Sequence, residues 1–206
     1  MLSSSAMLDS TFGRSGAVID RALNRLADVC IRRSLSADTL TYAAVVLGIV
    51  SGGLFAFGWM WTALLVVMGS GVADAVDGRV ARRSGRSTLW GGVIDLTFDR
   101  IVEAAVLLGI ALPRPVWHAP ALVLAATWYV NLCVFLAVGA ASDRTSEKII
   151  AYPPGLLERS ELLLLLLLVI VLPGWAPLAA YAYAALEVVT ATQRFVYGRR
   201  ALAGLR

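Results

Sequence analysis

Residues 74–100 read DAVDGRVARRSGRSTLWGGVIDLTFDR, and this stretch places four aspartates between two strongly apolar segments. Asp74 and Asp77 are three residues apart, so they project from one face of a helix. Asp95 and Asp99 are four residues apart and do the same on the next helix. The two pairs are symmetric about a basic turn centred near Arg86. An antiparallel hairpin therefore brings the inner carboxylates, Asp77 and Asp95, together, and the outer two likewise.

The rest of the chain has the composition of a membrane protein. It has 206 residues and is 59% hydrophobic, which excludes an ordinary soluble domain. We predict an all-α integral membrane protein with one domain over 1–206, because the connectors between apolar segments are short enough for antiparallel packing. The six predicted transmembrane helices of the bundle, within residues 36–200, are 39–57, 60–82, 90–112, 119–139, 161–172 and 177–196.

Residues 1–35 precede the bundle, and residues 18–34 have the pattern of an amphipathic helix. Ile19, Leu23 and Leu26 alternate with arginines at helical spacing. Such a helix can lie in the headgroup plane with its arginines near anionic lipid, so we predict a juxtamembrane, interfacial helix. A solvated helix packed against the bundle is the alternative interpretation. No pattern of a cleaved signal peptide is present, so we expect none to be removed.

The basic residues indicate how the bundle is oriented. In the six-span arrangement, all of the 18 lysines and arginines except Arg100 and Arg114 fall on one side. The positive-inside bias therefore predicts that both termini and the acidic hairpin face the cytoplasm. For a bacterial protein, the location would be the inner membrane. Membrane lipids, and not nucleic acid, are the partners that this arrangement predicts.

Four carboxylates at membrane depth need a compensating partner. They can be protonated, pair with arginines or bind cations. A salt-bridge network with Arg79, Arg82 and Arg100 is the structural alternative. A ligand set made only of oxygen, without histidine or cysteine, favours Mg²⁺ or Mn²⁺, and four carboxylates suit two such ions.

The same stretch fits the pattern D-x2-D-G-x2-A-R-x8-G-x3-D-x3-D at every fixed position. It resembles the CDP-alcohol phosphotransferases, which are integral membrane enzymes that make phospholipid headgroups. The resemblance extends to the chain length, the six spans and the N-terminal interfacial helix. The matching residues are Asp74, Asp77, Gly78, Ala81, Arg82, Gly91, Asp95 and Asp99.

The resemblance implies transfer of a phosphatidyl-type group from a CDP-linked lipid such as CDP-diacylglycerol to an alcohol, with release of CMP. It implies that Asp74, Asp77, Asp95 and Asp99 hold two divalent cations and that Asp99 is also the proton acceptor. Residues 36–41 resemble a second family element, although Ala37 replaces its proline, and N-capping is an alternative role there. The implied CDP-lipid contacts are Asp38, Thr41, Gly78, Ala81, Arg82 and Thr88. A homodimer is also expected from the family.

Two further segments resemble the phosphatidylinositol phosphate synthases within this family. Residues 155–161 read GLLERSE, and residues 190–194 read TATQR. The resemblance implies that Arg159 and Arg194 bind the phosphate of an acceptor such as inositol phosphate, with Arg144 as a third contact. The lysine of the family's Lys-x-Arg element is absent beside Arg144. Glycerol 3-phosphate or an unphosphorylated alcohol therefore stays open as the acceptor.

Two rival classes of membrane protein also use clustered aspartates. A polyprenyl-transferring enzyme would carry its aspartate-rich motifs on separate helices, and the fixed Gly78, Arg82 and Gly91 disfavour it. A small cation transporter would need acidic residues along a path to the far side, and the outward-facing segments have none. Two other intramembrane acids are expected to form structural pairs: Glu103 is predicted to orient Arg100 or the metal shell, and Glu187 shares a helix face with Arg194.

Overall fold

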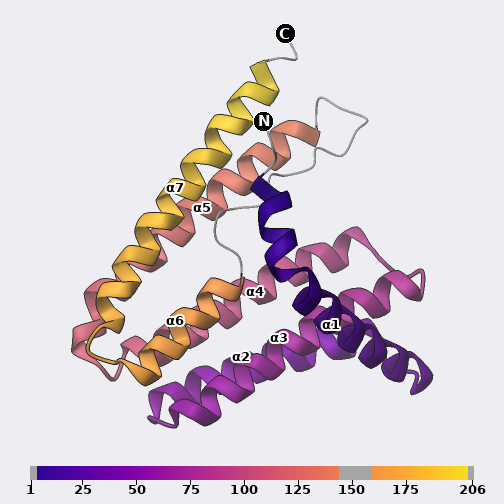
Figure 1. Ribbon diagram of the computed structural model, residues 1–206, viewed down its shortest axis with the longest axis horizontal. Helices are drawn as coiled ribbons and strands as arrows, with labels where there is room; N and C mark the ends of the chain where they lie inside the picture. Colours follow the sequence, from indigo (N-terminus) through magenta and orange to yellow (C-terminus); the bar gives the residue numbers. More distant parts are fainter. Residues whose placement is uncertain (1–3, 144–158, 204–206) are drawn as a thin grey trace. The chain divides into compact units, whose positions relative to one another are not determined.

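The computed structural model describes residues 4–143 and 159–203, and this part of the chain is helical throughout apart from short connectors (Figure 1). No strand occurs among these residues, so the predicted all-α class is confirmed. The elements in chain order are α1 (Ser4–Arg32), α2 (Ala37–Ala56), α3 (Met60–Arg83), α4 (Leu89–Ala111), the 3-10 helix η1 (Pro115–Trp117), α5 (His118–Asp143), α6 (Arg159–Val171) and α7 (Ala176–Ala203).

The helices α2 to α7 occupy the six segments that the apolar runs predict. α7 continues to Ala203, beyond the predicted end at Val196. α1 begins at Ser4, well before the predicted start at Val18, and no proline interrupts the added turns. Apolar runs therefore predict where a helix lies, but they do not mark the ends of helices that continue into polar sequence.

Three helical stretches of the described part are long and apolar enough to cross a membrane: Ala37–Ala56, Met60–Arg83 and Pro115–Ala141. The described length of α6 is 13 residues, or about 20 Å, which is short of the roughly 30 Å hydrocarbon core. α4 and α7 carry charged residues within their length, including Asp99 and Glu187. Six spans and the orientation of the termini stay predictions.

The chain divides into two compact units, residues 1–106 and 107–206, and the boundary falls inside α4. In the first unit, α2 and α3 form a hairpin around Gly58, whose positive φ of 83° suits a residue without a Cβ. Two buried serines link the helices: Ser51 Oγ donates to the Ala63 carbonyl at 2.8 Å, and Ser70 Oγ donates to the Ala44 carbonyl at 2.7 Å. α3, which carries Asp74 and Asp77, is thus held against α2.

Two glycines bring α2 close to α4. A Cβ at Gly48 would overlap the side chain of Val102, and a Cβ at Gly52 would overlap the carbonyl group of Ala105. Because the glycines are four residues apart, they share one face of α2. This contact places α4, which carries the second half of the acidic motif, directly against α2.

Replacing Gly52 by alanine is expected to destabilise the protein. The added methyl group must displace the α4 backbone, and overpacking of this kind costs about 1–3 kcal/mol. Gly53 is the matched control, because a Cβ there meets nothing within 4 Å. Gly53→Ala should be neutral or should stabilise by up to about 1 kcal/mol through helix propensity. Thermal unfolding in detergent measures both variants, and equal melting temperatures would contradict the close α2–α4 contact.

The helix α1 packs against α3. Ala27 is fully buried and forms an apolar cluster with Val76 and Val80. Two ion pairs join the same helices, Arg79–Asp20 at 2.7 Å and Arg83–Asp28. Ile19 and Leu26 on α1 are exposed, as expected of a helix that has both a protein-facing and a lipid-facing side. Its placement at the membrane interface stays a prediction.

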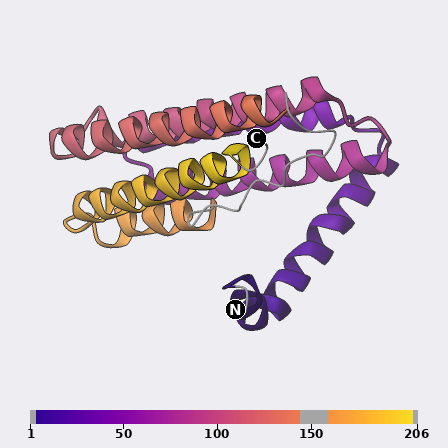
Figure 2. The same ribbon diagram turned by 90° about the horizontal axis from the view of Figure 1, so that it is seen from above.

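In the second unit, α5 and α7 pack along their length, and α6 lies beside α7 (Figure 2). Gly198 of α7 approaches α5 so closely that a Cβ would overlap the side chain of Val138. Ala180 and Ala184 of α7 are buried as well. Small residues on α7 therefore allow the close approach of α5, which is common between membrane helices.

Candidate active site

The predicted hairpin brings carboxylates from α3 and α4 together. Asp74 and Asp77 of α3 and Asp95 of α4 each offer an oxygen atom, and these oxygens all lie within 4.8 Å of one another. Asp77 is buried, Asp74 is half-buried and Asp95 is exposed. We name these three residues the carboxylate cluster. The donors are all hard oxygens and come from two helices, which fits a divalent cation such as Mg²⁺ or Mn²⁺.

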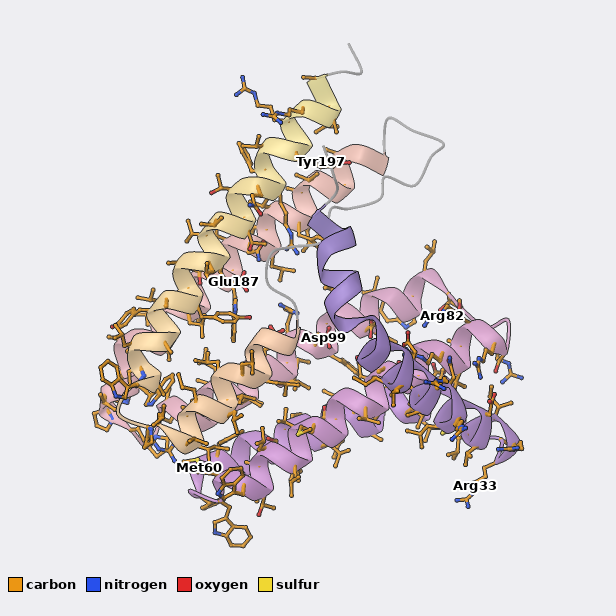
Figure 3. The ribbon with its side chains drawn as sticks, viewed as in Figure 1. Arg33, Met60, Arg82, Asp99, Glu187 and Tyr197 are labelled. Atoms are coloured by element: carbon orange, nitrogen blue, oxygen red, sulfur yellow. The ribbon has the colours of Figure 1, made fainter. Side chains whose placement is uncertain are left out.

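Asp99 flanks the carboxylate cluster without joining it. It is half-buried on α4, one turn beyond Asp95, as labelled in Figure 3. It is close enough for its charge to act on Asp77 and Asp95. The distances therefore separate the four aspartates into a tight group of three and one neighbour. Their assignment as four metal ligands stays a prediction.

Thr41 of α2 contacts the carboxylate cluster directly. Its hydroxyl lies within hydrogen-bond distance of Asp77 Oδ2 and of the Ala37 carbonyl, the latter at 3.0 Å. When it donates to Asp77, the hydroxyl holds that carboxylate in one orientation. The resemblance to the family implies a CDP-lipid contact for Thr41. The contact with Asp77 joins residues 36 positions apart, and no sequence spacing indicates it.

The arginines near the motif have other partners in the structure. Arg79 pairs with Asp20 of α1 at 2.7 Å, and Arg100 pairs with Glu103 at 2.8 Å. The predicted pairing of Glu103 with Arg100 is thus confirmed. The Arg82 guanidinium lies over Gly78, where a Cβ would come to 3.2 Å from Nη1. These contacts give no support to a network in which Arg79 and Arg100 neutralise the aspartates.

A cleft of about 640 Å³ adjoins the same part of the first unit. It is lined by the end of α1, the start of α2, the end of α3 and the start of α4. Ile94, which precedes Asp95, is one of its lining residues. Of the residues predicted to contact the CDP-lipid, Asp38, Ala81 and Thr88 line the cleft. The remaining three of that set, Thr41, Gly78 and Arg82, do not line it.

Two residues near the cleft cap helices. The Thr88 hydroxyl accepts a hydrogen bond from the Gly91 amide at 2.9 Å, at the start of α4. The Ser36 hydroxyl accepts from the Thr39 amide at 3.1 Å, so the predicted capping at the start of α2 is confirmed for Ser36. These caps fix the beginnings of the two helices that border the cleft.

The cleft also contains polar and aromatic residues that the sequence does not single out as substrate contacts. Tyr42 follows Thr41 on α2, and its ring lies 5.6 Å from that of Phe98 on α4. The other residues of this kind are Ser34, Ser84, Arg86 and Trp90. The basic turn between the two halves of the acidic motif makes Arg86 a foreseeable contact for a substrate. The other residues lie together only because four helices meet at the cleft.

The predicted acceptor-binding residues belong to the second unit. Arg194 on α7 donates from Nη1 to Asn131 Oδ1 on α5 at 2.8 Å, and its guanidinium lies 5.5 Å from the centre of the Phe135 ring. Asn131 Nδ2 donates to Glu187, which Figure 3 labels on α7. Glu187 thus has the structural partner that the sequence predicts, but the partner is Asn131, which the sequence analysis does not single out. The sequence signal for Asn131 is a polar amide within an otherwise apolar span.

Two predicted acceptor contacts have no described side chain. Arg144 lies outside the described residues. Arg159 is the first residue of α6, and only its backbone is described. Their roles stay predictions.

Known enzymes resemble this chain along most of its length. It is 28% identical over 200 residues to the phosphatidylinositol phosphate synthase of Cutibacterium acnes, covering 88% of this chain and 94% of the relative. It is also 28% identical over 194 residues to the archaetidylinositol phosphate synthase of Methanothermobacter thermautotrophicus, covering 92% of this chain and 94% of the relative.

Solved structures show the same fold. The phosphatidylinositol phosphate synthase PgsA1 of Mycobacterium tuberculosis, in complex with manganese and citrate, superposes with a TM-score of 0.70 at 24% identity. That match covers 85% of this chain and 88% of the other. The form of PgsA1 with CDP-DAG bound superposes with a TM-score of 0.65 at 24% identity, covering 86% of this chain and 94% of the other.

The family model named CDP-alcohol phosphatidyltransferase matches residues 34–193. This range contains the carboxylate cluster, Asp99 and the cleft-lining residues of α2, α3 and α4. The chain therefore belongs to the CDP-alcohol phosphatidyltransferase family, and it is a membrane enzyme of that class.

Proposed function

We propose that this enzyme transfers the phosphatidyl group of CDP-diacylglycerol to a phosphorylated polyol and releases CMP. The observation that carries the proposal is the carboxylate cluster, three carboxylates within 4.8 Å of one another on two helices next to a polar cleft. Relatives with this fold include phosphatidylinositol phosphate synthases, and inositol phosphate is the acceptor that we infer from their name.

Two divalent cations, Mg²⁺ or Mn²⁺, are the proposed cofactors, held by Asp74, Asp77 and Asp95 together with Asp99. When bound, such ions stabilise the negative charge on the diphosphate oxygens and on departing CMP. Manganese in the crystal structure of the M. tuberculosis relative supports this choice of metal. The Thr41 hydroxyl orients Asp77. Among the residues predicted to contact the CDP-lipid, we give this positioning role to Thr41.

Asp99 is proposed to accept the proton of the acceptor hydroxyl. It lies on α4 one turn beyond Asp95 and beside the carboxylate cluster, and a carboxylate positioned next to the reacting groups can act as a general base. As the acceptor oxygen bonds to the phosphorus of the phosphatidyl group, the bond from that phosphorus to the CMP oxygen breaks. CMP leaves with the electron pair of the broken bond, and Asp99 retains the proton.

The donor nucleotide is proposed to bind at the cleft and the adjoining α3 helix. Asp38, Ala81 and Thr88 line the cleft, and Gly78 leaves room for the Arg82 guanidinium to lie against the helix backbone. A cleft of about 640 Å³ is within the usual range for sites that enclose small molecules, roughly 300–1,000 Å³.

The acceptor phosphate is proposed to contact Arg194, together with Arg144 and Arg159. A planar guanidinium matches a phosphate in shape and charge. Glycerol 3-phosphate or an unphosphorylated alcohol is the alternative acceptor within the same reaction. The transporter alternative is not retained, because the family match identifies an enzyme.

The membrane arrangement that we propose has six spans in a single domain. The active site and both termini face the cytoplasm, as the distribution of arginines indicates. α1 lies at the interface, and a homodimer is proposed from the resemblance to the family.

Removal of divalent metal is expected to abolish CMP release from CDP-diacylglycerol by the purified protein. The reason is that the carboxylates alone would repel the diphosphate, whereas a divalent cation held by them would offset that repulsion. Stopped assays with EDTA, followed by addition of excess Mn²⁺ or Mg²⁺, measure the effect and its reversal. CMP release that persists in EDTA, after demonstrated metal depletion, would contradict the proposal.

A further inference from the structure

A polar network crosses from α5 to α7 within the second unit. Glu187 is only 6% exposed, so its polar group needs a partner in the protein. Asn131 supplies one, because its Nδ2 donates to the Glu187 carboxylate. The amide oxygen of Asn131 accepts from Arg194 Nη1 at 2.8 Å. One asparagine therefore links an acid and a base that lie seven positions apart on the neighbouring helix.

The chemistry of the side chains dictates which way the Asn131 amide points. A carboxylate accepts hydrogen bonds, so it must face the NH₂ group, and a guanidinium only donates, so it must face the carbonyl. Of the uncharged side chains, an amide offers both groups in one plane. Glu187 thus fixes the orientation of Asn131, and Asn131 in turn fixes the position of Arg194.

Phe135 provides a second anchor for the same guanidinium. It lies one turn from Asn131 on α5, and Arg194 stands 5.5 Å from the centre of its ring. The Asn131 carbonyl and the Phe135 ring thus hold the guanidinium from two positions on α5.

We propose that Asn131 and Glu187 are positioning residues that hold Arg194 as the receptor for the phosphate of the acceptor substrate. The inference rests on the proposed role of Arg194 in acceptor binding. It adds that recognition of a phosphorylated acceptor depends on an amide and an acid from inside the α5–α7 pair.

The test measures the KM for inositol phosphate and for CDP-diacylglycerol, with the full-length protein in detergent micelles. Asn131→Leu is expected to raise the KM for inositol phosphate about tenfold, with the donor KM and kcat within about twofold of wild type, because a fixed charge-assisted contact is lost. Glu187→Gln keeps an oxygen that accepts from Asn131 and should retain a near wild-type acceptor KM. Glu187→Leu should resemble Asn131→Leu.

Thr127→Val is the matched control on α5. The Thr127 hydroxyl donates to the Leu124 carbonyl of its own helix, so the variant removes a polar group from the same helix without touching Arg194. It is expected to leave both KM values unchanged. If it raised the acceptor KM as much as Asn131→Leu does, the effect would be one of general packing and the inference would be overturned.

Arg194→Gln separates failure of this inference from failure of the proposed function. An unchanged acceptor KM in Arg194→Gln would overturn both the acceptor role of Arg194 and the inference that rests on it. A raised acceptor KM in Arg194→Gln, with no change in Asn131→Leu, would overturn the inference alone. If Asn131→Leu does not fold, Asn131→Ser is measured in its place, and an unchanged acceptor KM in that variant would likewise overturn the inference.

Discussion

Asp99→Asn is expected to lower the rate of phosphatidyl transfer by about a thousandfold, within the range that a positioned general base contributes. The substitution removes the proposed proton acceptor but leaves the three carboxylates of the cluster within 4.8 Å of one another. Binding of CDP-diacylglycerol in the presence of Mn²⁺ should therefore be largely retained. CMP release measures the first effect, and equilibrium binding of the CDP-lipid measures the second.

Glu103→Gln is the control for this variant, because Glu103 lies one turn further along α4 and pairs with Arg100. It should retain most of the transfer rate. A transfer rate in Asp99→Asn within tenfold of wild type would remove Asp99 from the role of proton acceptor. Loss of CDP-lipid binding together with transfer would instead assign Asp99 mainly to metal binding.

Asp77→Asn is expected to lower the affinity for Mn²⁺ by at least about a hundredfold and to abolish transfer. Asp77 is the buried member of the carboxylate cluster and the one that contacts Thr41. Substitution of a residue that only supports a metal ligand costs about 10- to 100-fold in metal affinity. Asp77→Asn removes a proposed ligand itself, so its effect should be at least as large. Titration of Mn²⁺ monitored by electron paramagnetic resonance measures the affinity independently of activity.

Asp20→Asn is the matched control for Asp77→Asn. Asp20 is an acid of the same unit, but it pairs with Arg79 on the α1 side of α3. Its substitution should leave Mn²⁺ affinity unchanged. Wild-type affinity for Mn²⁺ in Asp77→Asn would show that the carboxylate cluster is not the metal site.

The helices and the acid grouping follow from local properties of the sequence. Apolar runs bounded by glycine and proline, as at Gly58 and Pro113, predict helices close to the observed ones. Helical periodicity places Asp74 and Asp77 on one face, and the symmetric turn brings Asp95 to them. The positions of the helices and the grouping of the aspartates depend only on helix geometry and on a short connector. Residue spacing and connector length can both be read directly from a sequence.

The contacts between helices could not be predicted in the same way. Thr41 reaches Asp77 across 36 positions, and Asn131 reaches Glu187 across 56. Such contacts depend on the rotation and register of each helix against its neighbour, which are set by packing at residues such as Gly52. The cleft has the same origin, because four elements contribute to its walls and none of them defines it alone.

The central claim is transfer of a phosphatidyl group to a phosphorylated polyol. Its most direct test supplies purified protein, Mn²⁺ and CDP-diacylglycerol with one acceptor at a time: inositol phosphate, glycerol 3-phosphate or free inositol. Mass spectrometry of the lipid product, alongside CMP release, identifies what was joined. We predict a phosphatidylinositol phosphate product that requires inositol phosphate and is lost in Asp99→Asn. Formation of phosphatidylinositol from free inositol, with no product from either phosphorylated acceptor, would contradict the claim.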